Sequence, residues 1–296
     1  MTKKVVALGF FDGVHIGHGA LLSRCAEIAR ENNLKACVMT YSRHPSEVVA
    51  KSPIKLINTT EERHELIEKL YGIRDIVIKD FTAEYAALSC REFAEKILRE
   101  ELSSAFVVAG FDFRFGRGGE GDAEKLSKLC RELDIGCEII SEVALDGEKV
   151  SSSRIRAALE KGDVAEATRL LGHNWCIISE VTHGKELGRT IDFPTINQGF
   201  CENRALPRFG VYASRVTVEG KAYPAITNIG VRPTVEEKTA PRAETHILNF
   251  SGELYGEIVR TELVEFIRDE KKFSTIAELR AQIEKDIASA TGLLKV

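Results

Sequence analysis

The chain has 296 residues, enough for two domains or one large one. Its hydrophobic content of 44% and charged content of 29% are ordinary for a globular protein, and no apolar run approaches the length of a membrane span. The net charge of −4 excludes a basic field for general nucleic-acid binding.

Residues 1 to about 140 alternate short apolar runs with helical patterns, which predicts an α/β domain with a doubly wound parallel sheet. Such sheets bind ligands at the carboxyl ends of their strands, where residues 9–18, 41–45 and 110–119 fall. The expected strands are 4–8, 36–41, 75–79, 106–109 and 137–140, and the expected helices include 60–71 with Thr60 as N-cap, 89–101 and 123–133.

The second part of the chain begins with two short helical patterns, at 154–161 and 163–171, which end at Gly162 and Gly172. The pattern changes near Asn174, where strand-like runs separated by Gly and Pro turns predict a mostly antiparallel β-barrel. The expected domains are therefore 1–174 and 175–296. The expected strands are 175–181, 211–218, 223–229, 244–250 and 258–266, and a closing helix is expected at 276–290.

The cysteines and the N-terminus indicate a cytoplasmic protein. The seven cysteines are an odd number without Cys-x-x-Cys pairs, which is typical of reduced thiols packed as small hydrophobes. Near the N-terminus, Asp12 and His15 interrupt the apolar run before a signal-peptide core can form.

The segment from Gly9 to His18, Gly-Phe-Phe-Asp-Gly-Val-His-Ile-Gly-His, links the first expected strand to a helical pattern. A strand, a glycine-rich turn and a helix start together aim backbone N–H groups at an anion. His15 and His18 are three residues apart and share a face in a first helical turn. Two imidazoles there can donate hydrogen bonds to a phosphate and take up positive charge as negative charge develops. The alternative is a surface loop with two solvated histidines.

Four segments, in this order, resemble the N-terminal module of the prokaryotic bifunctional riboflavin kinase/FAD synthetase family. That module is an FMN adenylyltransferase of the nucleotidyltransferase type. The four segments are residues 9–18, Thr40-Tyr-Ser-Arg-His-Pro45, Gly110-Phe-Asp-Phe-Arg-Phe-Gly116 and Ser151-Ser-Ser-Arg-Ile-Arg156.

The resemblance implies roles for residues in each of these segments. His15 and His18 would contact the ATP phosphates and act in catalysis, and Asp112 and His44 would orient the flavin or the nucleotide. A turn cap is the alternative role for Asp112, a plain loop position for His44 and a solvated surface charge for Arg156. The remaining residues implied in ATP or phosphate binding are Gly9, Asp12, Gly17, Ser151, Ser152 and Arg156.

The C-terminal part resembles the riboflavin kinase module of the same family. Its matching segments are Gly188-Arg-Thr-Ile-Asp-Phe-Pro-Thr-Ile-Asn197, Thr227-Asn-Ile-Gly-Val-Arg-Pro-Thr234, Glu244-Thr-His-Ile-Leu-Asn-Phe250 and Leu254-Tyr-Gly256.

In this module the resemblance implies that Thr195 and Asn197 bind Mg²⁺ and that Glu244 is the base for the riboflavin hydroxyl. Gly184, Gly188 and Arg189 would form a flap that binds the ATP phosphates, with a plain basic hairpin as the alternative.

The implied function is two-step flavin cofactor synthesis, with riboflavin, FMN and ATP as small-molecule substrates and Mg²⁺ as the metal. No nucleic-acid or membrane partner is expected, and the oligomeric state stays open. The family pattern has glycine where this chain has Asp192 and alanine where it has Ile196. Asp192 leaves open an FMN adenylyltransferase with an impaired kinase domain. An alternative from another class is a flavin-binding or regulatory protein that keeps the folds without turnover.

Overall fold

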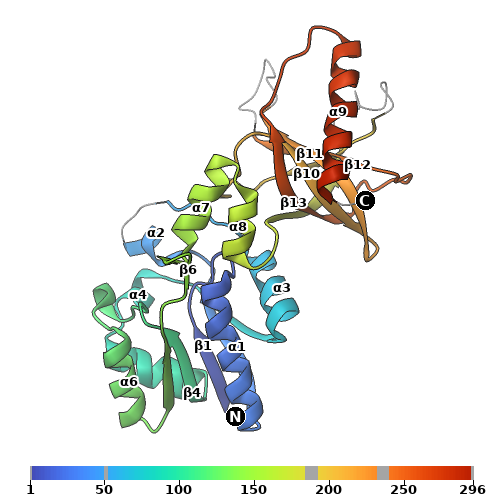
Figure 1. The fold of residues 1–296 in the computed structure, drawn as a ribbon. Coiled ribbons are helices and arrows are strands. Elements are labelled where there is room, and N and C mark those ends of the chain that lie inside the picture. Colours follow the sequence, from blue (N-terminus) through green and yellow to red (C-terminus); the bar gives the residue numbers. More distant parts are fainter. Residues whose placement is uncertain (1, 50–52, 184–192, 232–239, 295–296) are drawn as a thin grey trace. The chain divides into compact units, whose positions relative to one another are not determined.

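A computed structural model describes residues 2–49, 53–183, 193–231 and 240–294 (Figure 1). Contacts divide the chain into two compact units, Met1–Ser152 and Ser153–Val296. Each unit has hydrophobic clusters of its own. Helices α7 (Ser152–Lys161) and α8 (Val164–Leu171) group with the second unit, and the sequence-based domain boundary after residue 174 stays a prediction.

The first unit is built on a five-stranded sheet in the order β3-β2-β1-β4-β5, in which every described pair of neighbours is parallel. The predicted doubly wound parallel sheet is therefore confirmed. The strand order reverses between β1 and β4, which makes the carboxyl ends of these two strands the topological switch point where such sheets bind ligands. The strands are β1 (Lys4–Leu8), β2 (Lys35–Tyr41), β3 (Asp75–Lys79), β4 (Ser104–Gly110) and β5 (Gly136–Ile140).

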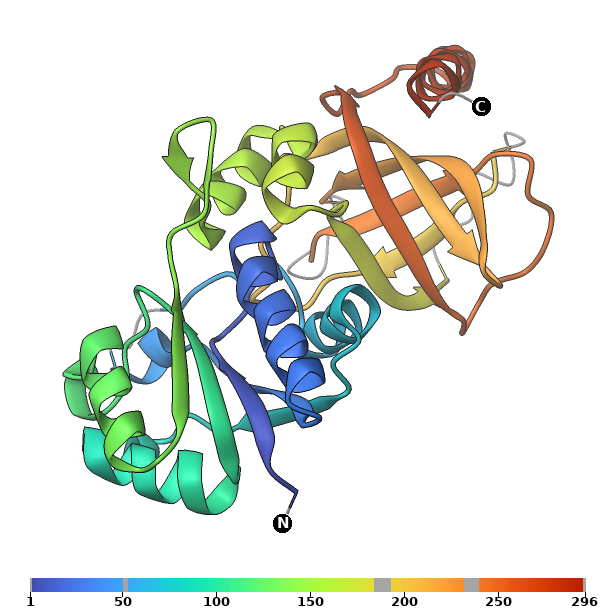
Figure 2. The same cartoon turned by 60° about the horizontal axis from the view of Figure 1, so that its bottom comes forward.

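Helices cover both faces of this sheet because successive strand residues point to opposite sides (Figure 2). Val5 and Ala7 pack beneath α1 (Ile16–Glu31) and α3 (Thr60–Tyr71). Val6 and Leu8 pack on the other side. The helical elements on that side include π-helix η1 (Phe93–Glu101), α5 (Cys90–Glu92) and α6 (Ala123–Glu132). The remaining short elements of this unit are α2 (Pro45–Val49), α4 (Ala83–Ala86), 3₁₀-helix η2 (Arg117–Gly119), β6 (Ala144–Leu145) and β7 (Glu148–Lys149).

Two predicted helices differ in detail. Thr59, not Thr60, is the N-cap of α3, because its hydroxyl accepts the Glu62 N–H while the Glu62 carboxylate accepts the Thr59 N–H. The helix expected at 89–101 has only one α-helical turn and continues as η1, in which hydrogen bonds reach five residues back, as from Leu102 N–H to the Ile97 carbonyl.

The second unit is a closed six-stranded barrel in the order β10-β11-β12-β9-β8-β13, antiparallel throughout. The predicted barrel is confirmed, although β9 was not expected as a strand. β12 ends earlier than expected because Asn249, with φ 56°, turns the chain. The strands are β8 (Cys176–Thr182), β9 (Ile196–Gly199), β10 (Gly210–Val218), β11 (Lys221–Gly230), β12 (Arg242–Ile247) and β13 (Ile258–Arg268).

The closing helix α9 (Ile276–Leu294) packs on the barrel through Ala290 and Leu294. A buried ion pair adds to this contact, with Arg268 Nε and Nη2 at 2.9 and 2.7 Å from the carboxylate of Asp286. No helix in the described ranges is long and apolar enough to cross a bilayer. All seven cysteines are free thiols, and five of them are buried.

Candidate functional site

The turn after β1 has an unusual backbone. Phe11 and Val14 have φ values of 58° and 45°, and a positive φ at a β-branched residue such as Val14 is a steric outlier. Both side chains are fully buried, so that core packing holds this shape. Gly9 and Gly17 fit the same turn, because an added Cβ would lie 2.8 Å from the Phe11 ring and 3.1 Å from the His15 ring respectively.

His15 and His18 meet at the start of α1, as the sequence predicts. His15 is the N-cap, and its Nδ1 accepts the backbone N–H of His18 at 3.2 Å. The rings stack with centroids 3.6 Å apart and 13° between their planes. Burial first, and then the charges of His15 and Arg63, holds the pKa of His18 well below its usual 6.5. His18 is therefore neutral near pH 7, a hydrogen-bonding group rather than a cation.

Asp12 ties this turn to its surroundings. Its side chain is only 3% exposed, and its Oδ1 accepts N–H groups of Ile57 at 2.8 Å and Asn58 at 3.3 Å. The Ser152 hydroxyl donates to the Asp12 backbone carbonyl at 2.9 Å. The structure thus brings the Ser151–Ser152 segment to the turn at residues 9–18. The Ser152 hydroxyl already donates its hydrogen bond to a backbone carbonyl of that turn.

The segment after β2 lies beside the same turn. The Thr40 hydroxyl donates to the Phe10 carbonyl at 2.9 Å, and the His44 ring meets the Phe10 ring edge-on with centroids 4.8 Å apart. His44 Nδ1 lies 2.6 Å from the Ser46 hydroxyl. A third contact joins the two segments: Arg63 of α3 donates a hydrogen bond to the Phe10 carbonyl, and the sequence analysis did not predict it. The available signal was an arginine on the helix face that also carries buried Leu66 and Ile67.

At the end of β4, Asp112 lies on the other side of the switch point. Its Oδ2 pairs with Lys149 Nζ of β7 at 2.7 Å, and Lys149 also lies over the Phe111 ring at 4.5 Å. Lys149 is another residue that the sequence did not single out. Arg156 lies on α7 in the second unit, and its contact with ATP stays a prediction.

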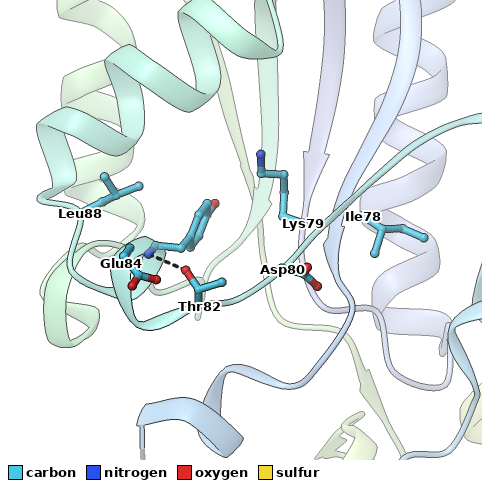
Figure 3. Close-up of a pocket in the computed structure, with 7 residues that line it drawn as sticks. Ile78, Lys79, Asp80, Thr82, Glu84 and Leu88 are labelled. Carbon is cyan, nitrogen blue, oxygen red and sulfur yellow. Dashed lines mark hydrogen bonds between the residues drawn. The ribbon is translucent and has the colours of Figure 1, made fainter.

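An open pocket of about 490 Å³ lies at the carboxyl end of β3 (Figure 3). Its lining includes Lys79, which pairs with Glu101 at 2.7 Å, and Thr82, whose hydroxyl accepts the Tyr85 N–H. The Tyr85 hydroxyl lies 3.4 Å from that of Tyr41. None of the predicted site residues lines this pocket.

In the barrel, three polar residues form a row across adjacent strands. Asn197 of β9 is opposite Glu244 of β12, which is opposite Asn228 of β11. The sequence predicted Asn197 and Glu244 separately. Their pairing was not predicted, because β9 is only four residues long and was not expected as a strand. Asn228 was not singled out, and its amide donates to Glu270 at 3.3 Å.

The row fits a hard cation on its asparagine side. Asn197 is 3% exposed, and its Oδ1 has no hydrogen-bond partner among the described residues. A buried amide oxygen without a donor calls for an explanation, and Mg²⁺ prefers oxygen ligands. Thr195 lies two residues earlier, directly before β9, and offers a hydroxyl oxygen close in sequence to Asn197.

The Pro194 carbonyl before Thr195 is held by His246 Nδ1 at 2.8 Å. Gly184, Gly188, Arg189 and Asp192 lie outside the described residues.

The comparisons with known proteins match the two parts of the chain to two different family models. The family model for FAD synthetase matches residues 1–154, and the model for riboflavin kinase matches residues 171–294. Two relatives carry the name "Bifunctional riboflavin kinase/FMN adenylyltransferase". One, from Bacillus subtilis, is 39% identical over 96% of this chain and 90% of its own length. The other, from Escherichia coli, is 38% identical over 97% and 91%.

A crystal structure from Streptococcus pneumoniae, described as a macrolide-efflux protein, is 32% identical. It covers 98% of this chain and 94% of that chain, with a TM-score of 0.86. Its description names a different activity, which belongs to that protein alone. The two family models, and relatives that are 38–39% identical over nearly the full length of the chain, confirm the resemblance seen in the sequence. The chain belongs to the family of bifunctional riboflavin kinase/FMN adenylyltransferases.

Proposed function

We propose that this chain makes FAD from riboflavin in two steps that each use ATP: phosphorylation of riboflavin to FMN, then adenylylation of FMN. One observation carries the proposal. Two separate candidate sites, the His15–His18 pair and the Asn197–Glu244–Asn228 row, lie in two units that match different family models.

In the adenylylation step, a phosphate oxygen of FMN attacks the α-phosphorus of ATP, the α–β phosphoanhydride bond breaks and pyrophosphate leaves. The protein's task is to position the phosphates and balance their charge. Because His15 Nδ1 accepts a backbone N–H, Nε2 is the ring nitrogen that can donate a proton to a phosphate oxygen. His18 would supply a neutral ring, and Ser151 and Arg156 further donors.

Asp12 and Ser152 support this site from behind through their hydrogen bonds to the backbone. Asp112, held by Lys149, would orient the ribose, the base or a metal at the switch point. His44 would act at the edge of the Phe10 ring.

In the kinase step, Glu244 accepts the proton of the riboflavin 5′-hydroxyl, whose oxygen attacks the γ-phosphorus while ADP leaves. Asn197 and Thr195 would hold Mg²⁺, which when bound neutralises charge on the ATP phosphates. Gly184, Gly188 and Arg189 stay sequence predictions for the phosphate-binding flap.

Mg²⁺ is supported by the oxygen-only donors at Asn197 and Thr195, and a cytoplasmic location by the free, mostly buried thiols. Riboflavin, FMN and ATP are the proposed partners, and no oligomeric state is assigned.

The test is incubation of the full chain with riboflavin and Mg-ATP, with chromatographic separation of the products. Formation of both FMN and FAD supports the proposal. FAD formed only from supplied FMN would mean an impaired kinase, which the pairing of Asn197 with Glu244 argues against. Neither product would mean a flavin-binding protein without turnover.

A further inference from the structure

We propose that Arg63 is a positioning residue for adenylyl transfer, which joins the turn after β1 to the end of β2 through one buried guanidinium. The inference rests on the proposed function of the first unit. It assigns a role to a side chain in α3 that lies in none of the four motif segments.

The guanidinium reaches two backbone carbonyls, one in each ligand-facing segment. Arg63 Nη1 donates to the Phe10 carbonyl at 2.8 Å, and Nη2 donates to the Tyr41 carbonyl at 2.8 Å. The guanidinium carbon also lies 4.4 Å from the centroid of the Phe10 ring, a cation–π contact. One rigid fork therefore fixes the relative position of the first two strand ends of the site.

This charge is costly to keep in the core. Arg63 is 2% exposed, and among the described residues no carboxylate lies within 4 Å of it. Burial lowers its pKa to about 10, against the opposing effects of Asp12 and Glu61, so that it is still charged at neutral pH. An apolar residue of similar size would fill the same space without a desolvation cost, so stability alone does not account for an arginine here.

One of the two segments that Arg63 joins, the turn after β1, has an unusual backbone. Phe10 precedes Phe11 and Val14, both at positive φ, and its carbonyl also accepts the Thr40 hydroxyl. Tyr41 leads into the turn with His44, whose ring meets the Phe10 ring. A shift of the Phe10 carbonyl would therefore move the His15–His18 pair and the His44 turn relative to each other.

The charge also faces the histidine pair. It is one of the causes that keep His18 neutral, together with burial and His15. On the other side, Asp12 contributes the opposite charge near Arg63. Arg63 thus supports both the geometry and the protonation state that the proposed phosphate contacts require.

The experiment compares Arg63→Met and Arg63→Lys in the full chain. The two activities of the chain are measured separately, as FAD formed from FMN and FMN formed from riboflavin. For Arg63→Met we expect kcat for FAD formation to fall about 10²-fold, the usual cost of a small misplacement of reacting groups. The KM for FMN and the riboflavin kinase activity of Arg63→Met should each stay within about twofold of the wild-type values. Arg63→Lys keeps the charge and one hydrogen bond, so its kcat for FAD formation should be about tenfold higher than that of Arg63→Met.

Two matched controls separate positioning from stability. Thr59→Ala weakens the N-cap of the same helix without changing either carbonyl contact. Arg204→Met removes a buried arginine from the second unit, where Arg204 donates to the Cys176 carbonyl at 2.7 Å and lies over Trp175. Neither control should lower FAD formation from FMN by more than about twofold.

Three outcomes would overturn the inference. The first is a folded Arg63→Met variant with wild-type kcat for FAD formation, and the second is an equal loss of that kcat in Thr59→Ala. The third is a fall in the riboflavin kinase activity of Arg63→Met as large as its fall in FAD formation. If Arg63→Met does not fold, a folded Arg63→Lys variant with wild-type kcat has the same consequence. A wild-type chain that forms no FAD from FMN would instead remove the proposed function, whatever Arg63 does.

Discussion

The imidazole rings of His15 and His18 lie face to face, 3.6 Å between centroids, with the Nδ1 of one bonded to the backbone N–H of the other. Stacking at this distance disfavours a charge on both rings. The pair is therefore unsuited to carry two charges at once, and His18 is the ring held neutral.

Removal of His18 should separate the two activities. We expect His18→Ala to abolish FAD formation and to leave phosphorylation of riboflavin nearly intact, because the histidine pair and the barrel row lie in different units. The measurement is a chromatographic assay of both products, with exposed His64→Ala of α3 as the control. Loss of both activities in a folded His18→Ala protein would show that the sites depend on each other.

The depressed pKa of His18 predicts a pH dependence of stability. Below 6.5 the unfolded chain binds a proton at His18 that the native state resists, so the free energy of unfolding should fall as the pH drops below 6.5 and be constant above it. The limiting slope is about 1.4 kcal/mol per pH unit. Amide exchange in β1 between pH 5 and 8 should show this slope in the wild type and lose it in His18→Asn; equal slopes would contradict a buried neutral His18.

The base in the kinase step can be tested by a substitution that keeps its size. Glu244→Gln removes the proposed proton acceptor, and we expect riboflavin and ATP binding to survive while turnover falls about 10²–10⁴-fold. Glu219→Gln is a matched control, because it lies in the turn at the far end of the β10–β11 hairpin from Asn228. Wild-type turnover in Glu244→Gln would remove this residue from the mechanism.

The ion pair of α9 predicts a stability difference between two carboxylates of one helix. Asp286→Asn leaves the largely buried Arg268 charge without its carboxylate partner and should cost about 3 kcal/mol. Glu284→Gln breaks an exposed pair with Arg280 and should cost about 0–1 kcal/mol. Denaturant unfolding followed by fluorescence of buried Trp175, the single tryptophan of the chain, reports on this unit; equal costs would contradict the role of the pair.

Much of this fold is readable from periodicity, because the elements pack one face at a time. The strand at 4–8 alternates between two helical layers, and the α9 pattern through Ile283 and Ile287 marks its buried side. The capping residue of α3 was misplaced by one position, because adjacent threonines offer the same hydroxyl. Hydrogen bonding, not sequence, selects Thr59.

The candidate site was predictable where a motif is continuous in sequence. His15 and His18 are close in the chain, so their stacking follows from helical spacing. Arg63 and Lys149 were missed because their roles depend on contacts with backbone or side chains that are distant in sequence. The pairing of Asn197 with Glu244 was missed for the same reason: strand register is a property of the closed barrel and not of either segment.

The Asn197–Glu244–Asn228 row has a consequence for how such a site can evolve. Each member belongs to a strand with ladder partners on both sides, so none can shift without disturbing its neighbours. Substitutions in the connecting loops can change the surroundings of the row while the strand pairing holds its members opposite one another. Substrate preference and the geometry of the proposed kinase site can therefore vary independently in this unit.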